Sequence, residues 1–176
     1  EAVEIGTEIL TMKKVRAYNR YGVWPFSVAL HWGIYLFIIW ALLLILESLV
    51  GGALLNAVLR PLGIIASLAG IAGAAGLIIR RATSPDLSSY TAPVDYFNLA
   101  FLGAIFVFGL ISTLADPVLA GHKAYMDSVL RFRPGAAPWT VVVTFLLFQA
   151  FIIYMPFSKM LHYVIKFFLY HQGLWD

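Results

Sequence analysis

Four long apolar runs, separated by shorter polar connections, set the pattern of this chain. They cover about residues 25–49, 62–79, 94–114 and 139–154. A helix needs roughly 20 apolar residues to cross the hydrocarbon core of a bilayer, and each run is close to that length. The pattern therefore predicts an all-α, polytopic membrane protein in which four transmembrane helices form a bundle.

The two ends of the chain are more polar than the runs. Residues 1–23 mix acidic and basic side chains with scattered apolar ones, which predicts an interfacial arm rather than a span. Pro156 is expected to kink the fourth helix, which then continues through His162. We therefore expect the arm, a four-span bundle over residues 24–162, and an amphipathic interfacial tail over residues 163–176 on the cytoplasmic side.

Charge is sparse and lies mostly at the ends of the runs. Only 12% of the residues are charged and the net charge is +3, which predicts a role in membrane topology and not in nucleic-acid binding. The side of the membrane that holds both chain ends collects more basic residues than the other, and this asymmetry predicts that both ends are cytoplasmic. The residues are Lys13, Lys14, Arg16, Arg20, Arg80, Arg81, Lys159 and Lys166 on that side, against Arg60, Lys123, Arg131 and Arg133 on the other. The chain starts with glutamate and not methionine, so a further helix can precede it.

Two histidines at opposite ends of the sequence are expected at the same depth of the membrane. His31 lies in the first turns of a helix that begins on the cytoplasmic side, and His162 lies near the end of one that finishes there. A planar macrocycle with two imidazole ligands requires such a pair on facing helices. Each histidine alone is equally compatible with an interfacial residue that bonds a backbone carbonyl, and position does not distinguish haem from another cofactor.

The residues around both histidines resemble one membrane protein family. The stretch Pro156-Phe157-Ser158-Lys159-Met160-Leu161-His162, with Leu30-His31-Trp32-Gly33-Ile34, is similar to the cytochrome b (gamma) subunit of respiratory nitrate reductase. Related subunits occur in heterodisulfide reductases and in the membrane complex linked to dissimilatory sulfite reductase. The connection with Arg80-Arg81 and Ser84-Pro85 also resembles that family.

The resemblance implies a b-type haem with His31 and His162 as axial iron ligands. It implies a subunit of the prokaryotic cytoplasmic membrane that relays electrons between menaquinone, or another quinone, and an iron–sulfur partner subunit. The chain has no cysteine, so the clusters must belong to another chain. The two-haem members of the family have further histidine ligands where this chain has Ala41 and Thr144, so the resemblance implies only one haem.

Other residues have two interpretations each. Gly33 is small either because the porphyrin lies against the backbone or because two helices pack there. Glu47 is either an end residue reaching toward the headgroups or a proton acceptor for a quinol. Ala66, Gly70 and Ala74, four residues apart, form a strip that another helix or a flat ligand can approach closely. His122 and His171 are expected at the surface or in partner contacts. The alternatives are a role of His122 in quinone chemistry or unusual haem ligation, and replacement of His162 as ligand by His171 if the tail folds back.

Two other function classes compete with electron transfer. A structural anchor without a cofactor would hold a complex to the membrane, and an optical spectrum separates it from a cytochrome. A small transporter is disfavoured, because Glu47 is the only acid within a predicted span and no pair of broken helices is evident.

Overall fold

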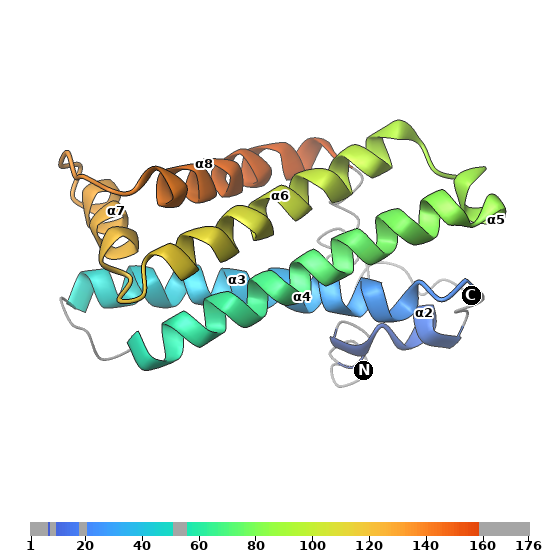
Figure 1. Cartoon of the computed structure of the whole chain (residues 1–176), viewed down its shortest axis with the longest axis horizontal. Helices are drawn as coiled ribbons and strands as arrows, with labels where there is room; N and C mark the ends of the chain where they lie inside the picture. Colours follow the sequence, from blue (N-terminus) through green and yellow to red (C-terminus); the bar gives the residue numbers. More distant parts are fainter. Residues whose placement is uncertain (1–6, 8–9, 18–20, 51–55, 159–176) are drawn as a thin grey trace, which may run out of the picture.

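The computed structural model describes residues 7, 10–17, 21–50 and 56–158. Within these residues the chain is helical and contains no strand, as the apolar pattern predicts. Four helices are long and apolar enough to cross a membrane: α3 (Trp24–Val50), α4 (Asn56–Thr83), α6 (Pro93–Ala115), and α8 (Trp139–Tyr154) with the 3₁₀ turn η1 (Met155–Phe157) that extends it (Figure 1). The chain is a multi-pass membrane protein with an all-α bundle.

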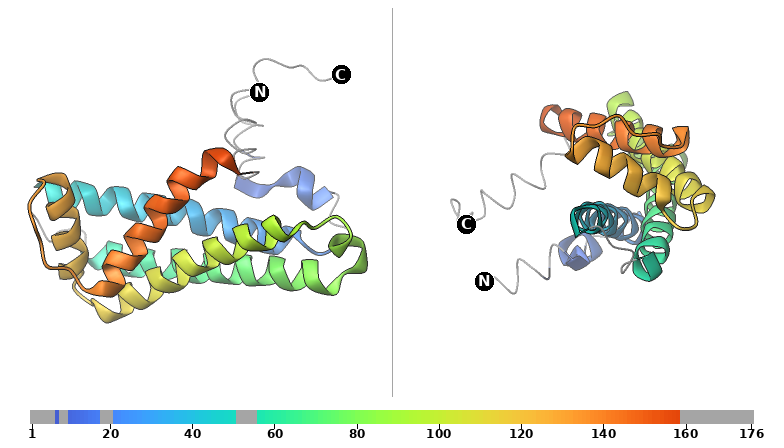
Figure 2. Two further views of the ribbon diagram at one scale, coloured as in Figure 1. Left: turned by 90° about the horizontal axis from the view of Figure 1, so that it is seen from above. Right: turned by 90° about the vertical axis from the view of Figure 1, so that its left-hand side faces the viewer.

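The four spans run alternately up and down, with short helices at the two ends of the bundle. α3 packs against α4, α4 against α6, and α6 against α8, while α8 crosses the other spans obliquely (Figure 2). α5 (Pro85–Ser88) lies in the connection between α4 and α6, at the end where α3 begins. α7 (Ala120–Leu130) lies across the opposite end and contacts α3 and α8. Less than half of each span is buried within the protein, so the remaining apolar side chains face outward.

Small residues bring α3 and α4 into close contact. A Cβ atom at Gly33 would lie 2.6 Å from the backbone nitrogen of Gly70, and one at Gly73 would lie 2.3 Å from the backbone nitrogen of Leu30. On the other side, a Cβ atom at Gly70 would meet the ring of Phe106 on α6 at 2.3 Å. The small-residue strip of α4 therefore serves helix packing, which is one of the two uses that its spacing predicts.

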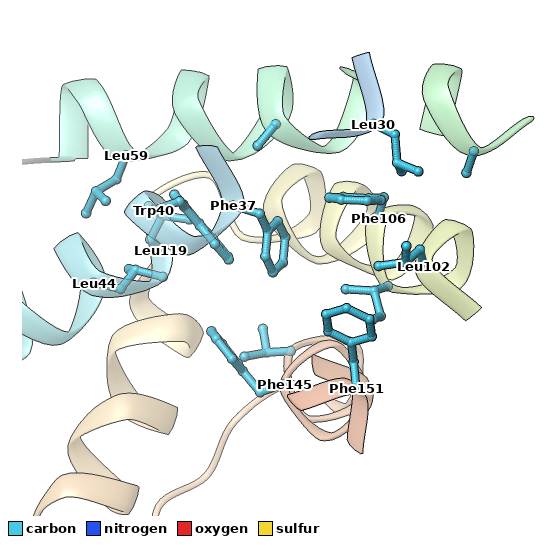
Figure 3. Close-up of a cluster of buried hydrophobic side chains, with 14 of the residues drawn as sticks. Leu30, Phe37, Trp40, Leu44, Leu59, Leu102, Phe106, Leu119, Phe145 and Phe151 are labelled. Atoms are coloured by element: carbon cyan, nitrogen blue, oxygen red, sulfur yellow. The ribbon is translucent and has the colours of Figure 1, made fainter. Parts of the chain in front are cut away.

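Aromatic side chains fill the centre of the bundle. Phe37 and Trp40 of α3 are essentially inaccessible, and Phe145 of α8 stacks on Trp40 with the ring planes only 2° apart. Phe106 of α6 meets Phe37 edge to face. These rings turn toward one another from three helices (Figure 3), so they join α3, α6 and α8 in one buried core.

The structure departs from the predicted elements in several connections. α4 begins six residues before the expected start and carries Pro61 in its second turn, where the ring removes one intrahelical hydrogen bond. α5 and α7 are helices in segments that the polar pattern marks only as loops. At Pro156 the α-helix gives way to the 3₁₀ turn η1. The expected continuation through His162, and the tail, lie outside the described residues.

Part of the predicted arm lies against the first span. α2 (Lys13–Ala17) follows residues 10 and 11, whose carbonyl oxygens accept hydrogen bonds from two tryptophans of α3. Trp24 Nε1 donates to Thr11 at 2.9 Å and Trp32 Nε1 to Leu10 at 3.0 Å. Arg16 lies over the ring of Trp24. The described residues of the arm are thus tied to the beginning of α3.

Candidate functional site: a cavity between the first and last spans

A largely apolar cavity of about 720 Å³ lies between α3 and α8, with α6 along its floor. Its volume is within the range of about 300–1,000 Å³ that is usual for cofactor and small-ligand sites. The contacts of the bundle run from α3 through α4 and α6 to α8, so this cavity occupies the remaining side. Its lining residues are Leu30, His31, Ile34, Tyr35, Ile38, Ala41, Leu42, Ile45, Arg81, Asp95, Asn98, Leu99, Leu102, Phe148, Phe151, Ile152 and Met155.

His31 lines the cavity and has a fixed orientation. Its Nδ1 atom lies 2.7 Å from the carbonyl oxygen of Ser27, one turn earlier on α3. Since a carbonyl can only accept, Nδ1 carries the proton and the lone pair is on Nε2. A histidine that binds a metal through one ring nitrogen usually donates from the other to a carbonyl or carboxylate. The ring of His31 therefore meets a requirement for an axial ligand.

Polar side chains gather at the end of the cavity where α4 ends and α6 begins. Arg81 contributes its guanidinium, whose Nη1 lies 3.4 Å from Thr91 Oγ1 and whose Nε is buried with no hydrogen-bond partner. Asp95 Oδ2 accepts a hydrogen bond from the backbone of Ala92 before the N-terminus of α6. Asn98 Oδ1 accepts one at 2.8 Å from the hydroxyl group of Tyr154 on α8. The cavity thus combines apolar walls with one polar end.

The structure brings together only some of the residues that the sequence marks. His162, the expected second ligand, and His171 lie outside the described residues. Gly33 is buried in the contact with α4 and is not among the lining residues, so its geometry matches helix packing rather than contact with a porphyrin. Arg81 and Asn98 were not singled out for this site, although both are polar residues within or directly beside an apolar run.

Glu47 also differs from its expected place. The prediction of a residue that reaches toward the headgroups is wrong, because Glu47 is only 3% exposed. Its Oε1 atom accepts a hydrogen bond from Lys123 Nζ of α7 at 3.2 Å, and the Lys123 side chain is itself mostly covered. Glu47 does not line the cavity. Its carboxylate instead joins α3 to α7 at the far end of the bundle.

His122 is the clearest correction to the sequence analysis. It was expected at the surface, but it is completely buried on the inner face of α7. Its Nδ1 lies 2.8 Å from Asp116 Oδ2 and its Nε2 lies 3.2 Å from Ser112 Oγ. Trp40 and Phe145 meet the imidazole edge to face. A polar network of side chains therefore closes this end of the bundle.

The local backbone explains how His122 becomes buried. Asp116, the last residue before the turn, accepts hydrogen bonds from the backbone nitrogens of Ala120 and His122, and so caps the first turn of α7. Leu119 adopts the left-handed conformation with φ 56° and is fully buried. An acidic residue just after an apolar run, followed six residues later by histidine, is the sequence signal that could have indicated this pairing.

Burial sets the protonation of His122. It lowers the pKa of the imidazole below its ordinary value of 6.5, and the hydrogen bond and the charge of Asp116, which raise the pKa, do not fully compensate. At neutral pH the ring is then neutral, with the Nδ1 proton donated to Asp116. Nε2 faces the hydroxyl group of Ser112, whose one proton is shared between this nitrogen and the carbonyl oxygen of Gly109. Because Ser112 is itself fully buried, this Asp–His–Ser chain fastens helices and offers no reachable nucleophile.

The cavity residues fit a haem better than a bare metal ion. Among the described residues there is no group of three histidine, cysteine or acidic side chains that could hold an ion. A haem iron needs only axial ligands from the protein, and its macrocycle needs an apolar slot. The fold and the cavity define a multi-pass helical membrane protein with a ligand-sized lateral cavity. No protein family model, curated protein or solved structure matches the chain, so the resemblance to the cytochrome b subunits stays a prediction.

Proposed function

We propose that this chain is the membrane-anchor cytochrome b subunit of a respiratory redox complex. It relays electrons between a quinone pool, such as menaquinone, and an iron–sulfur partner subunit on the cytoplasmic side of a prokaryotic cytoplasmic membrane. The observation that carries the proposal is the cavity of about 720 Å³ with His31 at its wall, where the Nδ1 atom of His31 lies 2.7 Å from the carbonyl oxygen of Ser27, as is usual for a histidine that binds a metal through its other ring nitrogen. The subunit is incomplete as an enzyme without its partner.

The chain's own residues have defined tasks in this proposal. A b-type haem, when bound, supplies a one-electron couple at a fixed place in the membrane. His31 binds the iron through Nε2, and His162, on the motif that resembles the family's, is the proposed second axial ligand. The carbonyl of Ser27 prevents rotation of the His31 ring. Apolar side chains such as Leu102 and Phe151 exclude water, which keeps the dielectric low around the site.

The packing at the opposite end of the bundle is a second argument for one haem per chain. Thr144 stands where the two-haem members of the family have a ligand, and its buried hydroxyl donates to the carbonyl of Thr140 at 2.8 Å. The stacked rings of Trp40 and Phe145 and the buried His122 fill the space around it. This packing, with threonine in place of the family's ligand, supports the proposal of a single haem.

The pairing of Glu47 with Lys123 limits its use as a proton acceptor for a quinol. A carboxylate paired with Lys123 can exchange a proton with a quinol only if that pairing opens, since Lys123 holds Oε1 at 3.2 Å. The polar end of the cavity, near Asn98 and Tyr154, offers hydroxyl and amide groups closer to the proposed haem. We accordingly place quinone chemistry nearer that end and keep Glu47 as a second candidate.

Optical spectra of histidine variants test the proposal. The purified wild-type chain should show the spectrum of a low-spin bis-histidine haem, while H31A and H162A should lose haem. H122A is the matched control, because it removes a buried histidine of the same bundle that does not line the cavity, and its spectrum should be unchanged. A wild-type chain with no Soret band would favour the cofactor-free anchor, and an unchanged spectrum in H31A would reject His31 as a ligand.

A further inference from the structure

Among the described residues, Arg81 is the one lysine or arginine that lines the cavity, and it lies in the last turn of α4. The spans that carry the other lining residues contribute no lysine or arginine to the wall. A guanidinium has five hydrogen-bond donors in a planar fork and stays protonated. Its charge at the edge of an apolar cavity therefore needs a partner.

The donors of Arg81 are only partly satisfied within the described residues. The Nε atom is buried and has no hydrogen-bond partner, and the contact of Nη1 with Thr91 Oγ1, at 3.4 Å, is long. Arg81 forms no ion pair with any residue that the structure describes. A buried donor without an acceptor is costly, and natural proteins rarely keep one without a reason. A ligand in the cavity can supply the acceptor.

The neighbouring polar groups are engaged elsewhere. The carboxylate of Asp95 accepts the backbone hydrogen bond of Ala92 and lies in the first turn of α6, where the helix dipole favours a negative charge. The oxygen of Asn98 accepts from Tyr154. Asp95 and Asn98 thus have their own partners in the fold, which leaves the fork of Arg81 as the group suited to an acidic part of the ligand.

We infer that Arg81 binds a carboxylate of the ligand in this cavity, specifically a propionate of the haem. The inference rests on the proposed function and goes one step further, because it assigns a recognition residue that the ligand motifs do not contain. A propionate pairs with a guanidinium through two parallel hydrogen bonds, which satisfies Nε and one terminal nitrogen together. The pair neutralises both charges at the edge of the apolar cavity.

The test compares haem with its dimethyl ester, in which both propionates are neutral. Apoprotein in detergent is titrated with each, and the ratio of the two dissociation constants is measured. Wild type should bind haem about tenfold or more tightly than the ester, as expected for hydrogen bonds to a charged group. In R81Q the ratio should fall close to one. The steric effect of the methyl groups is common to all variants, so the change in the ratio reports on Arg81.

R80Q is the matched control, because Arg80 is the preceding residue, is exposed, and does not line the cavity. It removes the same charge from the same helix end and should keep the wild-type ratio. R81M provides a second neutral variant in case R81Q does not fold. Equal affinity of the wild type for haem and ester would overturn the inference whatever the variants show, as would an unchanged ratio in R81Q. A wild type that binds neither compound would instead overturn the proposed function itself.

Discussion

His31 and His122 are both held through Nδ1, but by acceptors of different charge. His31 bonds the neutral carbonyl of Ser27, which fixes the tautomer and leaves the ring beside a cavity. His122 bonds the carboxylate of Asp116, packs against aromatic rings and does not line the cavity between α3 and α8. The first arrangement suits ligation, whereas the second suits attachment of one helix to another.

Removing the His122 side chain should therefore loosen α7 without affecting the cavity. H122A removes the buried hydrogen bonds of the imidazole with Asp116 and Ser112, and we expect a loss of about 1–3 kcal/mol in the free energy of unfolding, measured by thermal denaturation in detergent. D127A is the control on the same helix, because the half-exposed side chain of Asp127 pairs with Arg131 at the surface. Its effect should be below about 1 kcal/mol. Equal losses in the two variants would contradict the assigned role of His122.

The same histidine predicts a pH dependence of stability. The folded pKa lies below 6.5, so the unfolded chain takes up the proton first as the pH falls. The contribution of His122 to stability is therefore complete above about pH 6.5 and declines as the pH drops from there toward the folded pKa. The difference in melting temperature between wild type and H122N should shrink from pH 8 to pH 5. A constant or growing difference would contradict a folded pKa below the ordinary value of the imidazole.

Helix contacts explain which elements the sequence could predict. The long apolar runs predict the four spans because length and composition alone decide them. α7 was missed because its helix depends on Asp116 as a cap and on tertiary contacts, including the stacking of Tyr125 on Phe145. Similarly, the ion pair of Glu47 with Lys123 joins residues 76 positions apart, which no local pattern indicates.

The close contact between α3 and α4 predicts that a glycine-to-alanine substitution in a helix lowers the stability of the protein, whereas such a substitution usually raises it. Alanine normally stabilises a helix relative to glycine by about 1 kcal/mol. In G33A, however, the new methyl group would lie 2.6 Å from the backbone of Gly70, so we expect a net loss of about 1–3 kcal/mol from overpacking. Thermal denaturation of the apoprotein measures it. In G103A the nearest atom is 3.7 Å away, and this control should be neutral or stabilising; a G33A protein as stable as G103A would disprove the close packing.

At the scale of the whole molecule, the helix ends and basic residues that we expect on the cytoplasmic side lie together at one end of the bundle. α3 begins there, α8 ends there, and Arg80 and Arg81 at the end of α4 lie there with α5 (Figure 1). The polar network around His122 lies at the opposite end. This placement agrees with the orientation that the distribution of basic residues predicts.

Cysteine labelling tests that orientation, because the chain has no cysteine of its own. Ser89, beside α5, and Ala136, between α7 and α8, are both exposed and lie at opposite ends of the bundle. With an impermeant maleimide applied to intact cells, A136C should react and S89C should react only after the membrane is opened. The reverse pattern would place the proposed partner-binding side outside the cell.

The sequence predicted the candidate site only in part. The position of His31 in the first turns of an apolar run was enough to mark it as a possible ligand. The cavity itself depends on how α8 crosses α3 and on side chains from four helices, so neither its volume nor the presence of Arg81 and Asn98 could be read from local patterns. The role of Gly33 could be decided only once its distance to Gly70 was known.

The central claim is that the cavity between the first and last spans holds one haem. A pyridine haemochrome spectrum of the purified wild-type chain, with the protein quantified by amino-acid analysis, measures this directly. The account predicts one b-type haem per chain. A chain that carries no haem, or two, would contradict it.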